Sequence, residues 1–220
     1  MNDYIKGMLK DAFILFIITL AAGLILGVVY QVTKEPIAAQ KEKVKQEACK
    51  EVFSEAENFE TVQTAQAEDG WVLQKGELGF EAVDIDEVMK ASDTDHNMLG
   101  YVITVTDHEG YSGDIQFMLG IRSDGTLNGI SILSISETAG LGMRAEEVLK
   151  PQFESKKVEV FEYTKTEARG ENQIDAISGA TITTNAVTNG VNAGLNYFRT
   201  VLKDMPVNDR NSMEGGSGNE

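Results

Sequence analysis

The stretch DAISGATITTNAV, Asp175 to Val187, decides the fold because it joins a hydroxyl-rich loop to the last apolar pattern of the chain. Four hydroxyl side chains lie within seven of its residues: Ser178, Thr181, Thr183 and Thr184. Beyond them, apolar residues recur at steps of three or four, which predicts an amphipathic helix packed on a sheet: Val187, Val191, Leu195, Phe198 and Leu202. The hydroxyl-rich stretch is therefore predicted to be the loop that enters this helix.

A loop of this kind has two chemical interpretations. The first turn of a helix carries unpaired backbone N–H groups and the positive end of the helix dipole, and Gly179 and Ala180 would let a phosphate approach them. Serine and threonine are also favoured N-cap residues, so the same pattern is typical of a helix start without a ligand. The spacing alone leaves both interpretations open.

The residues before this stretch predict an antiparallel sheet. YVITVTDHEGY (101–111), DIQFMLGI (114–121) and LNGISILSI (127–135) are apolar, β-branched runs, and Asp124-Gly125 between the last two is a strong hairpin-turn signal. GMRAEEVLKPQF (142–153) predicts a short helix that ends near Pro151. The fold class is therefore α+β, with an antiparallel sheet and flanking helices.

An uncharged apolar run, AFILFIITLAAGLILGVVY (12–30), has the length that a helix needs to cross a bilayer. A cleaved signal peptide is the alternative, but the run is longer than a signal core. The expected organisation is a short segment at 1–11, a transmembrane helix at 12–30, a membrane-proximal stalk at 31–58, a domain at 59–206 with its core at 99–204, and a disordered tail at 207–220. The helix of the stalk is expected to begin near Pro36.

Charge and composition exclude several classes of function. The net charge of -16 argues against a nucleic-acid partner, because such binding depends on Lys and Arg contacts to phosphate. One cysteine, Cys49, and two histidines predict neither a disulfide framework nor a transition-metal site. A redox role would need an organic cofactor. The methionines are expected in the core, and His108 is expected to be a solvated turn residue.

Three stretches, in order, carry a resemblance to a known family. DAISGAT (175–181) resembles the D-x-x-[ST]-G-A-T flavinylation motif of the FMN-binding domain family, whose last threonine carries FMN through a phosphodiester. SETAGLGM (136–143) is similar to the family's E-T-P-G-L-G segment, with Ala139 in place of the usual proline, and GYSGDIQFMLGIRSDGTLNGISIL (110–133) is similar to its strand pair. With the N-terminal span, most of the chain resembles the G subunits of Rnf electron-transport complexes.

The resemblance implies a function and a location. It implies a single-pass protein of the cell membrane whose FMN-binding domain lies outside the cytoplasm, although the lysines after the span would place that domain inside. The chain would relay electrons as part of a ferredoxin:NAD⁺ oxidoreductase, with other membrane subunits as partners and a flavin transferase attaching the FMN, and would not be a complete enzyme. The C subunit of the Na⁺-translocating NADH:quinone reductase and a flavin-carrying regulatory module remain alternatives.

The resemblance also implies roles for individual residues. Thr181 would carry FMN covalently, while Ser178, Gly179 and Ala180 shape the loop around the phosphate. Asp175 is expected either to guide the transferase or to be only a turn residue. The flavin-contacting stretch corresponds to Glu137, Thr138, Gly140 and Leu141. Tyr111 is a candidate to stack on the flavin ring, with ordinary packing as its alternative.

Overall fold

The computed structural model describes residues 2–64 and 79–203, and of residues 2–4, 63 and 64 it describes the backbone only. The expected tail at 207–220 lies outside the described residues. The chain forms two compact units, residues 1–46 and 47–220, and each is considered by itself.

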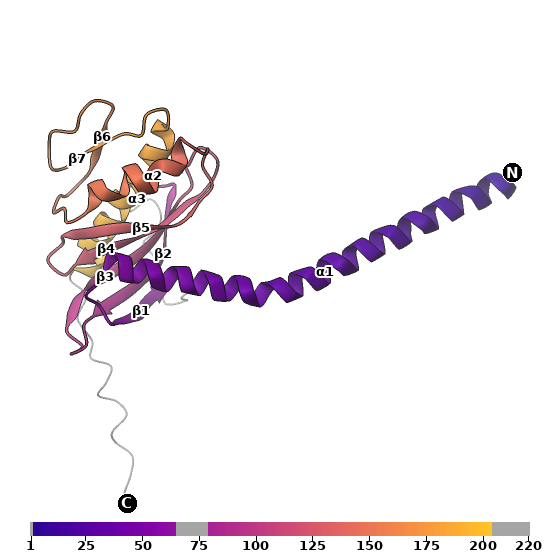
Figure 1. The fold of residues 1–220 in the computed structure, drawn as a ribbon, viewed down its shortest axis with the longest axis horizontal. Coiled ribbons are helices and arrows are strands. Elements are labelled where there is room, and N and C mark those ends of the chain that lie inside the picture. Colours follow the sequence, from indigo (N-terminus) through magenta and orange to yellow (C-terminus); the bar gives the residue numbers. More distant parts are fainter. Residues whose placement is uncertain (1, 65–78, 204–220) are drawn as a thin grey trace, which may run out of the picture. The chain divides into compact units, whose positions relative to one another are not determined.

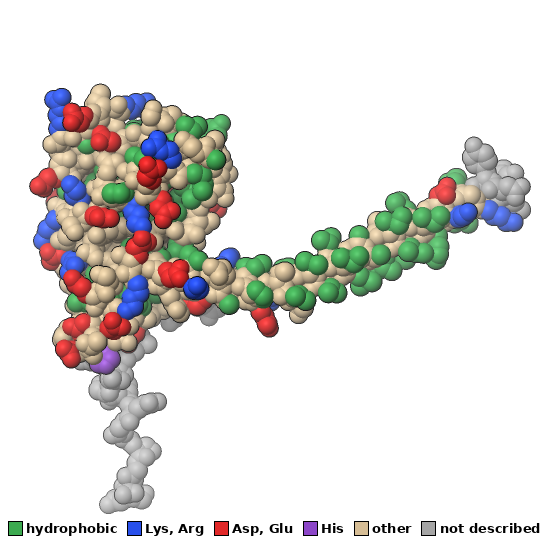
Figure 2. Space-filling model, viewed as in Figure 1, with side chains coloured by type: hydrophobic (Ala, Val, Ile, Leu, Met, Phe, Trp, Pro, Cys, Tyr) green, Lys and Arg blue, Asp and Glu red, His purple; other side chains and the backbone are tan. Residues whose placement is uncertain are grey.

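The first unit is the larger part of one helix, α1, which runs from Asn2 to Val52 (Figure 1). Pro36 lies inside this helix, so the prediction that a separate helix starts there was wrong. α1 is the one helix of the described residues long and apolar enough to cross a membrane, with a mean hydropathy of 2.8 in its most apolar window. That window buries none of its residues within the protein, and hydrophobic side chains line much of the visible side of the helix between its charged ends (Figure 2). A helix of this kind is stable in lipid, because all its backbone groups bond within the segment.

The second unit is built on a five-stranded antiparallel sheet in the order β1-β2-β3-β4-β5. The strands are β1 (Asn58–Thr64), β2 (Val83–Ser92), β3 (Met98–Asp107), β4 (Ile115–Arg122) and β5 (Leu127–Ile135). The last three are the meander that the sequence predicts. Gly125 has φ +85° in the turn between β4 and β5, and the carboxylate of Asp124 accepts the N–H of Thr126 at 2.9 Å. Both features suit an Asp-Gly turn.

One face of the sheet is covered by α3 (Thr181–Tyr197) and the π-helical turn that continues it, Phe198–Leu202. The five apolar residues that predict this helix are all buried, which confirms its amphipathic character: Val187, Val191, Leu195, Phe198 and Leu202. Gly190 permits the close approach, since a Cβ there would lie 2.6 Å from the ring of Phe117 on β4.

The opposite face is covered by the end of α1 and the residues just after it. Cys49, Val52 and Phe53 are buried there in one cluster with Met118 and Val102 of the sheet. Residues that the sequence assigns to a stalk therefore include part of the domain core.

Short elements complete the α+β fold: η1 (Gly142–Arg144), α2 (Ala145–Val148), η2 (Lys150–Phe153), β6 (Glu162–Thr164) and β7 (Gln173–Asp175). The predicted short helix at 142–153 corresponds to η1, α2 and η2. β6 and β7 pair in parallel, and β7 leads into the turn before α3. This order places the hydroxyl-rich stretch at the N-terminus of α3.

Candidate functional site

The first turn of α3 begins at Thr181, and no side chain caps it. The N-cap position belongs to Ala180, whose N–H donates to the carbonyl of Ile177 at 3.0 Å. Gly179 has φ +80°, a conformation that favours glycine. Since neither Ser178 nor Thr181 caps the helix, the N-cap interpretation of the hydroxyls was wrong. The N–H groups of the first turn remain available to solvent or to an anion.

The hydroxyls of the stretch fall into two groups. Thr183 is buried and donates to Glu137 Oε2 at 2.9 Å. Thr184 is also buried; its hydroxyl donates to the carbonyl of Ala180 at 2.9 Å and accepts the N–H of Ile177 at 3.1 Å. Ser178 is exposed and Thr181 partly exposed, and neither hydroxyl bonds to a described residue. Only the second group could react with a ligand without breaking a contact of the fold.

Glu137 lies at the centre of the site. Its carboxylate is buried, with Oε1 accepting the N–H of Ser112 at 3.1 Å and Oε2 accepting the hydroxyl of Thr183. A Cβ on Gly142 would lie 2.6 Å from both Glu137 Cβ and Thr183 Oγ1. The β3–β4 loop, the segment after β5 and the start of α3 therefore meet at one carboxylate.

Exposed apolar side chains belong to these same three segments. The fractional exposures are 68% for Tyr111, 41% for Leu141, 44% for Met143 and 51% for Ile182. The side chain of Leu141 lies against the turn at Gly179, where an added Cβ would be 3.1 Å from Leu141 Cδ2. Met143 is thus an exception to the expectation that the methionines belong to the core. Such side chains next to polar backbone groups suit a ligand with one flat apolar part and one anionic part.

Asp175, Thr138 and Gly140 each have a role in a turn. Asp175 Oδ1 accepts the N–H of Ala168 at 2.6 Å, which closes the loop between β6 and β7. The carbonyl of Thr138 accepts the N–H of Leu141 at 3.1 Å, and Gly140 has φ +75° in that turn. The side chains of Asp175 and Thr138 are exposed, which leaves an additional role in recognition open to both.

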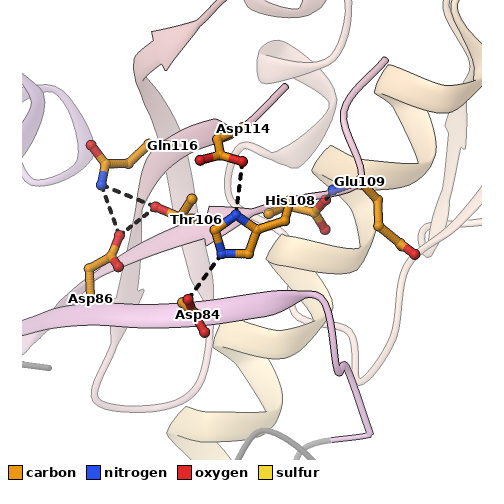
Figure 3. Close-up of polar contacts among 8 residues, drawn as sticks. Asp84, Asp86, Thr106, His108, Glu109, Asp114 and Gln116 are labelled. Atoms are coloured by element: carbon orange, nitrogen blue, oxygen red, sulfur yellow. Dashed lines mark hydrogen bonds and ion pairs between the residues drawn. The ribbon is translucent and has the colours of Figure 1, made fainter. Parts of the chain in front are cut away.

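His108, directly after β3, bridges Asp84 of β2 and Asp114, the residue before β4 (Figure 3). Its Nδ1 is 2.8 Å from Asp114 Oδ1, and its Nε2 is 3.0 Å from Asp84 Oδ2. These hydrogen bonds, first with Asp84 and then with Asp114, raise the pKa of His108 above its usual value. The exposure of His108 at a bend confirms the prediction of a solvated turn residue, whereas its two carboxylate partners were not predicted.

Asp107, which the sequence reasoning missed, is fully buried beside His108. One carboxylate oxygen accepts the N–H of Glu109 at 2.7 Å, and Oδ2 has no partner among the described residues. Burial, the largest cause, raises the pKa of Asp107 to about 6. The strand alternation could have revealed it, since Asp107 continues the inward series of Ile103 and Val105.

Comparison with known proteins shows where the chain belongs. Two family models match it: the FMN-binding domain at residues 110–196 and the RnfG N-terminal region at residues 1–52. The G subunit of the Na⁺-translocating ferredoxin:NAD⁺ oxidoreductase complex of Acetobacterium woodii is 32% identical over 200 residues, which cover 90% of this chain and 95% of that protein. The chain belongs to the family of Rnf complex G subunits.

Two further proteins are also similar to this chain. The G subunit of the ion-translocating oxidoreductase complex of Methanosarcina acetivorans is 28% identical, over 87% of this chain and 95% of that protein. A further match is the solved structure of the C subunit of the Na⁺-translocating NADH-quinone reductase from Parabacteroides distasonis. The match covers 69% of this chain and 80% of that protein's chain, with 19% identity and a TM-score of 0.48. The FMN-binding match includes every candidate site residue from Tyr111 to Thr181, and the N-terminal match ends at Val52, where α1 ends.

Proposed function

We propose that this chain is the electron-relay subunit of an Rnf-type, ion-translocating ferredoxin:NAD⁺ oxidoreductase, with FMN bound covalently to Thr181. The relatives from Acetobacterium woodii and Clostridium ljungdahlii are named as G subunits of complexes with this activity. One observation carries the site: Thr181 presents a partly exposed hydroxyl, unbonded to described residues, at the uncapped N-terminus of α3. The FMN-binding match over residues 110–196 supports the choice of cofactor.

The residues present fit an attached flavin phosphate. Attachment would form a bond from Thr181 Oγ1 to the FMN phosphorus of FAD, break the bond between the two phosphates, release AMP and remove the hydroxyl proton. A magnesium-dependent flavin transferase would supply the catalysis. The resulting phosphodiester carries one negative charge, which the free N–H groups and the dipole of α3 favour.

The flavin ring has a suitable apolar surface nearby. Leu141 and Met143 come from the segment after β5, Tyr111 from the β3–β4 loop and Ile182 from α3 itself. Burying these side chains under the ring would remove apolar surface from water, at about 25 cal/mol per Å². When bound, FMN would supply one- or two-electron redox chemistry, and these residues would orient its ring.

The proposed side of the membrane is the extracytoplasmic one. The lysine count after the span points the other way, but long domains are translocated largely regardless of nearby charge. Covalent attachment supports the proposal, because dilution outside the cell would remove a flavin that binds reversibly. Thr181 then acts as a tether.

The test is replacement of Thr181 in the full chain, produced together with an active flavin transferase. The unsubstituted protein should gain the mass of one FMN less one water and fluoresce in a denaturing gel. Thr181→Val keeps the size and β-branching of the side chain but removes the nucleophile, so the fold should survive and the fluorescence should disappear.

Ser178→Ala is the matched control, because Ser178 offers the other exposed hydroxyl of the stretch. It should keep the flavin. Thr183→Val and Thr184→Val are poor controls, since loss of the Thr184 hydroxyl leaves the buried N–H of Ile177 unpaired, which costs about 1–3 kcal/mol. Covalent flavin retained in Thr181→Val, or lost in Ser178→Ala alone, would place the bond elsewhere. Its absence from all the proteins would refute the proposed cofactor attachment.

A further inference from the structure

One buried carboxylate, that of Glu137, holds both the β3–β4 loop and the start of α3 to the segment after β5. Glu137 is 8% exposed and follows β5, Ser112 lies in the β3–β4 loop beside Tyr111, and Thr183 lies two residues after Thr181 in α3. We propose that Glu137 is a positioning residue, which fixes the first turn of α3 relative to the loop that carries Tyr111. This inference rests on the proposed flavin attachment at Thr181.

Both oxygens of Glu137 are occupied by protein donors. Oε1 is 3.1 Å from the N of Ser112, and Oε2 is 2.9 Å from Thr183 Oγ1. The resemblance alone would place Glu137 in contact with the flavin. The geometry instead assigns its carboxylate to the protein, so its effect on a flavin would pass through the two segments that it joins.

Two glycines leave room for the carboxylate. A Cβ on Gly110 would lie 2.9 Å from Oε1, and a Cβ on Gly142 would lie 2.8 Å from Oε2. Contacts this short would displace the carboxylate, so glycine at both positions leaves the space that its two hydrogen bonds require.

The charge of Glu137 makes these bonds strong. Within the described residues, no Lys, Arg or His forms an ion pair with it, and its partners are the Ser112 N–H and a hydroxyl in the first turn of α3. The positive end of the helix dipole favours a carboxylate there. Hydrogen bonds to a charged group are stronger than neutral ones, and losing one shifts a local opening equilibrium about tenfold or more.

The experiment uses the full chain in detergent, with and without flavin, and compares Glu137→Ala, Glu137→Gln and Thr183→Val. Hydrogen exchange of flavin-free protein reports the loop at 110–113, and exchange in β4 reports the global fold. In Glu137→Ala the protection of the loop should fall about tenfold or more, while that of β4 is retained. Glu137→Gln should restore most of it, because its amide oxygen accepts from Ser112 and its NH₂ can donate to Thr183 Oγ1.

With flavin attached, the readouts are the fluorescence anisotropy and the visible circular dichroism of the flavin. Glu137→Ala should keep the covalent flavin, because Thr181 is intact, but lower both signals. Glu146→Ala is the matched control: it removes an exposed glutamate on α2 and should change neither. Thr183→Val removes the hydroxyl that bonds Glu137 Oε2 and leaves the loop at 110–113 unsubstituted, so faster exchange in that loop would show that the two segments are coupled.

The outcomes separate this inference from the proposed function. If the unsubstituted chain gains no flavin, the attachment at Thr181 fails, and the exchange result alone still tests the coupling. Unchanged loop protection in both Glu137→Ala and Thr183→Val, or an unchanged flavin signal in a fully flavinylated Glu137→Ala, would overturn the positioning role. If Glu137→Ala does not fold, Thr183→Val decides the question by the same measurements.

Discussion

Replacing Asp107 by asparagine should remove a pH-dependent loss of stability. Asp107 is fully buried on the α3 side of the sheet, and its Oδ2 has no partner within the described part of the chain. The nearby carboxylates of Glu109 and Asp114 also raise the pKa of Asp107, while the Glu109 N–H and His108 lower it, and the result is about 6, against 3.8 for an ordinary aspartate.

These two pKa values determine whether the free energy of unfolding rises or falls with pH. The folded state binds the Asp107 proton more tightly than the unfolded state, so the contribution of Asp107 to stability falls as pH rises from about 4 to about 6. A difference of roughly two pKa units corresponds to about 3 kcal/mol at most. Solvent screening near the β3–β4 loop reduces the expected value to about 1–2 kcal/mol.

The measurement is urea unfolding of the full chain in neutral detergent between about pH 4.5 and about 7.5, followed by near-UV circular dichroism. The introduced amide can still accept the N–H of Glu109 through its oxygen, and it adds a cost that does not depend on pH. The free energy of unfolding of Asp107→Asn, minus that of the unsubstituted protein, should rise by about 1–2 kcal/mol across this range. Asp95→Asn, at an exposed turn between β2 and β3, provides the control. A flat difference for Asp107→Asn would show that the carboxylate is hydrated or paired, and the reasoning from burial would be wrong.

Two further predictions concern the membrane anchor. A fragment that starts at Lys34 should be soluble and folded. One that starts at Asn58 should be destabilised by more than about 3 kcal/mol, because it lacks the buried Val52 and Phe53. Aggregation of the longer fragment would refute the separation of anchor and domain. Thr94→Cys, at an exposed turn, should react with an impermeant maleimide in intact cells or spheroplasts. The buried thiol of Cys49 should stay unreactive. Labelling of the introduced thiol only after lysis would place the domain in the cytoplasm.

The predictable part of the fold is the part with regular periodicity. β3 to β5 and α3 follow strict patterns of apolar residues, and the Asp124-Gly125 turn fixes one connection. β2 gives a weaker signal because its register shifts between Ile85 and Glu87, which breaks the alternation of inward and outward residues. The burial of Cys49 was also not predicted, because it depends on the end of α1 packing against a sheet formed by residues far along the chain.

The sequence predicts where the candidate site lies along the chain, but not which of its hydroxyls are buried and hydrogen-bonded. The motif resemblance favours Thr181, yet four hydroxyls lie close together in the sequence, and the hydrogen bonds that bury two of them depend on Glu137 and Ile177. A helical projection from Val187 would have separated the buried threonines from Thr181. Thr183 and Thr184 lie four and three residues before it, on the same buried face, whereas Thr181 lies on another.

The position of Thr181 gives a physical reason why attachment there is compatible with the fold. A phosphate ester on Thr184 would break the bonds of its hydroxyl to Ala180 and Ile177, and one on Thr183 would break its bond to Glu137. A diester on Thr181 would break no hydrogen bond among the described residues. Its phosphate oxygens would also lie near N–H groups that no side chain caps. The exposed Ser178 lacks this second advantage, because it precedes the turn at Gly179. Of the four hydroxyls, that of Thr181 is therefore the one at which an added phosphate gains contacts without removing any.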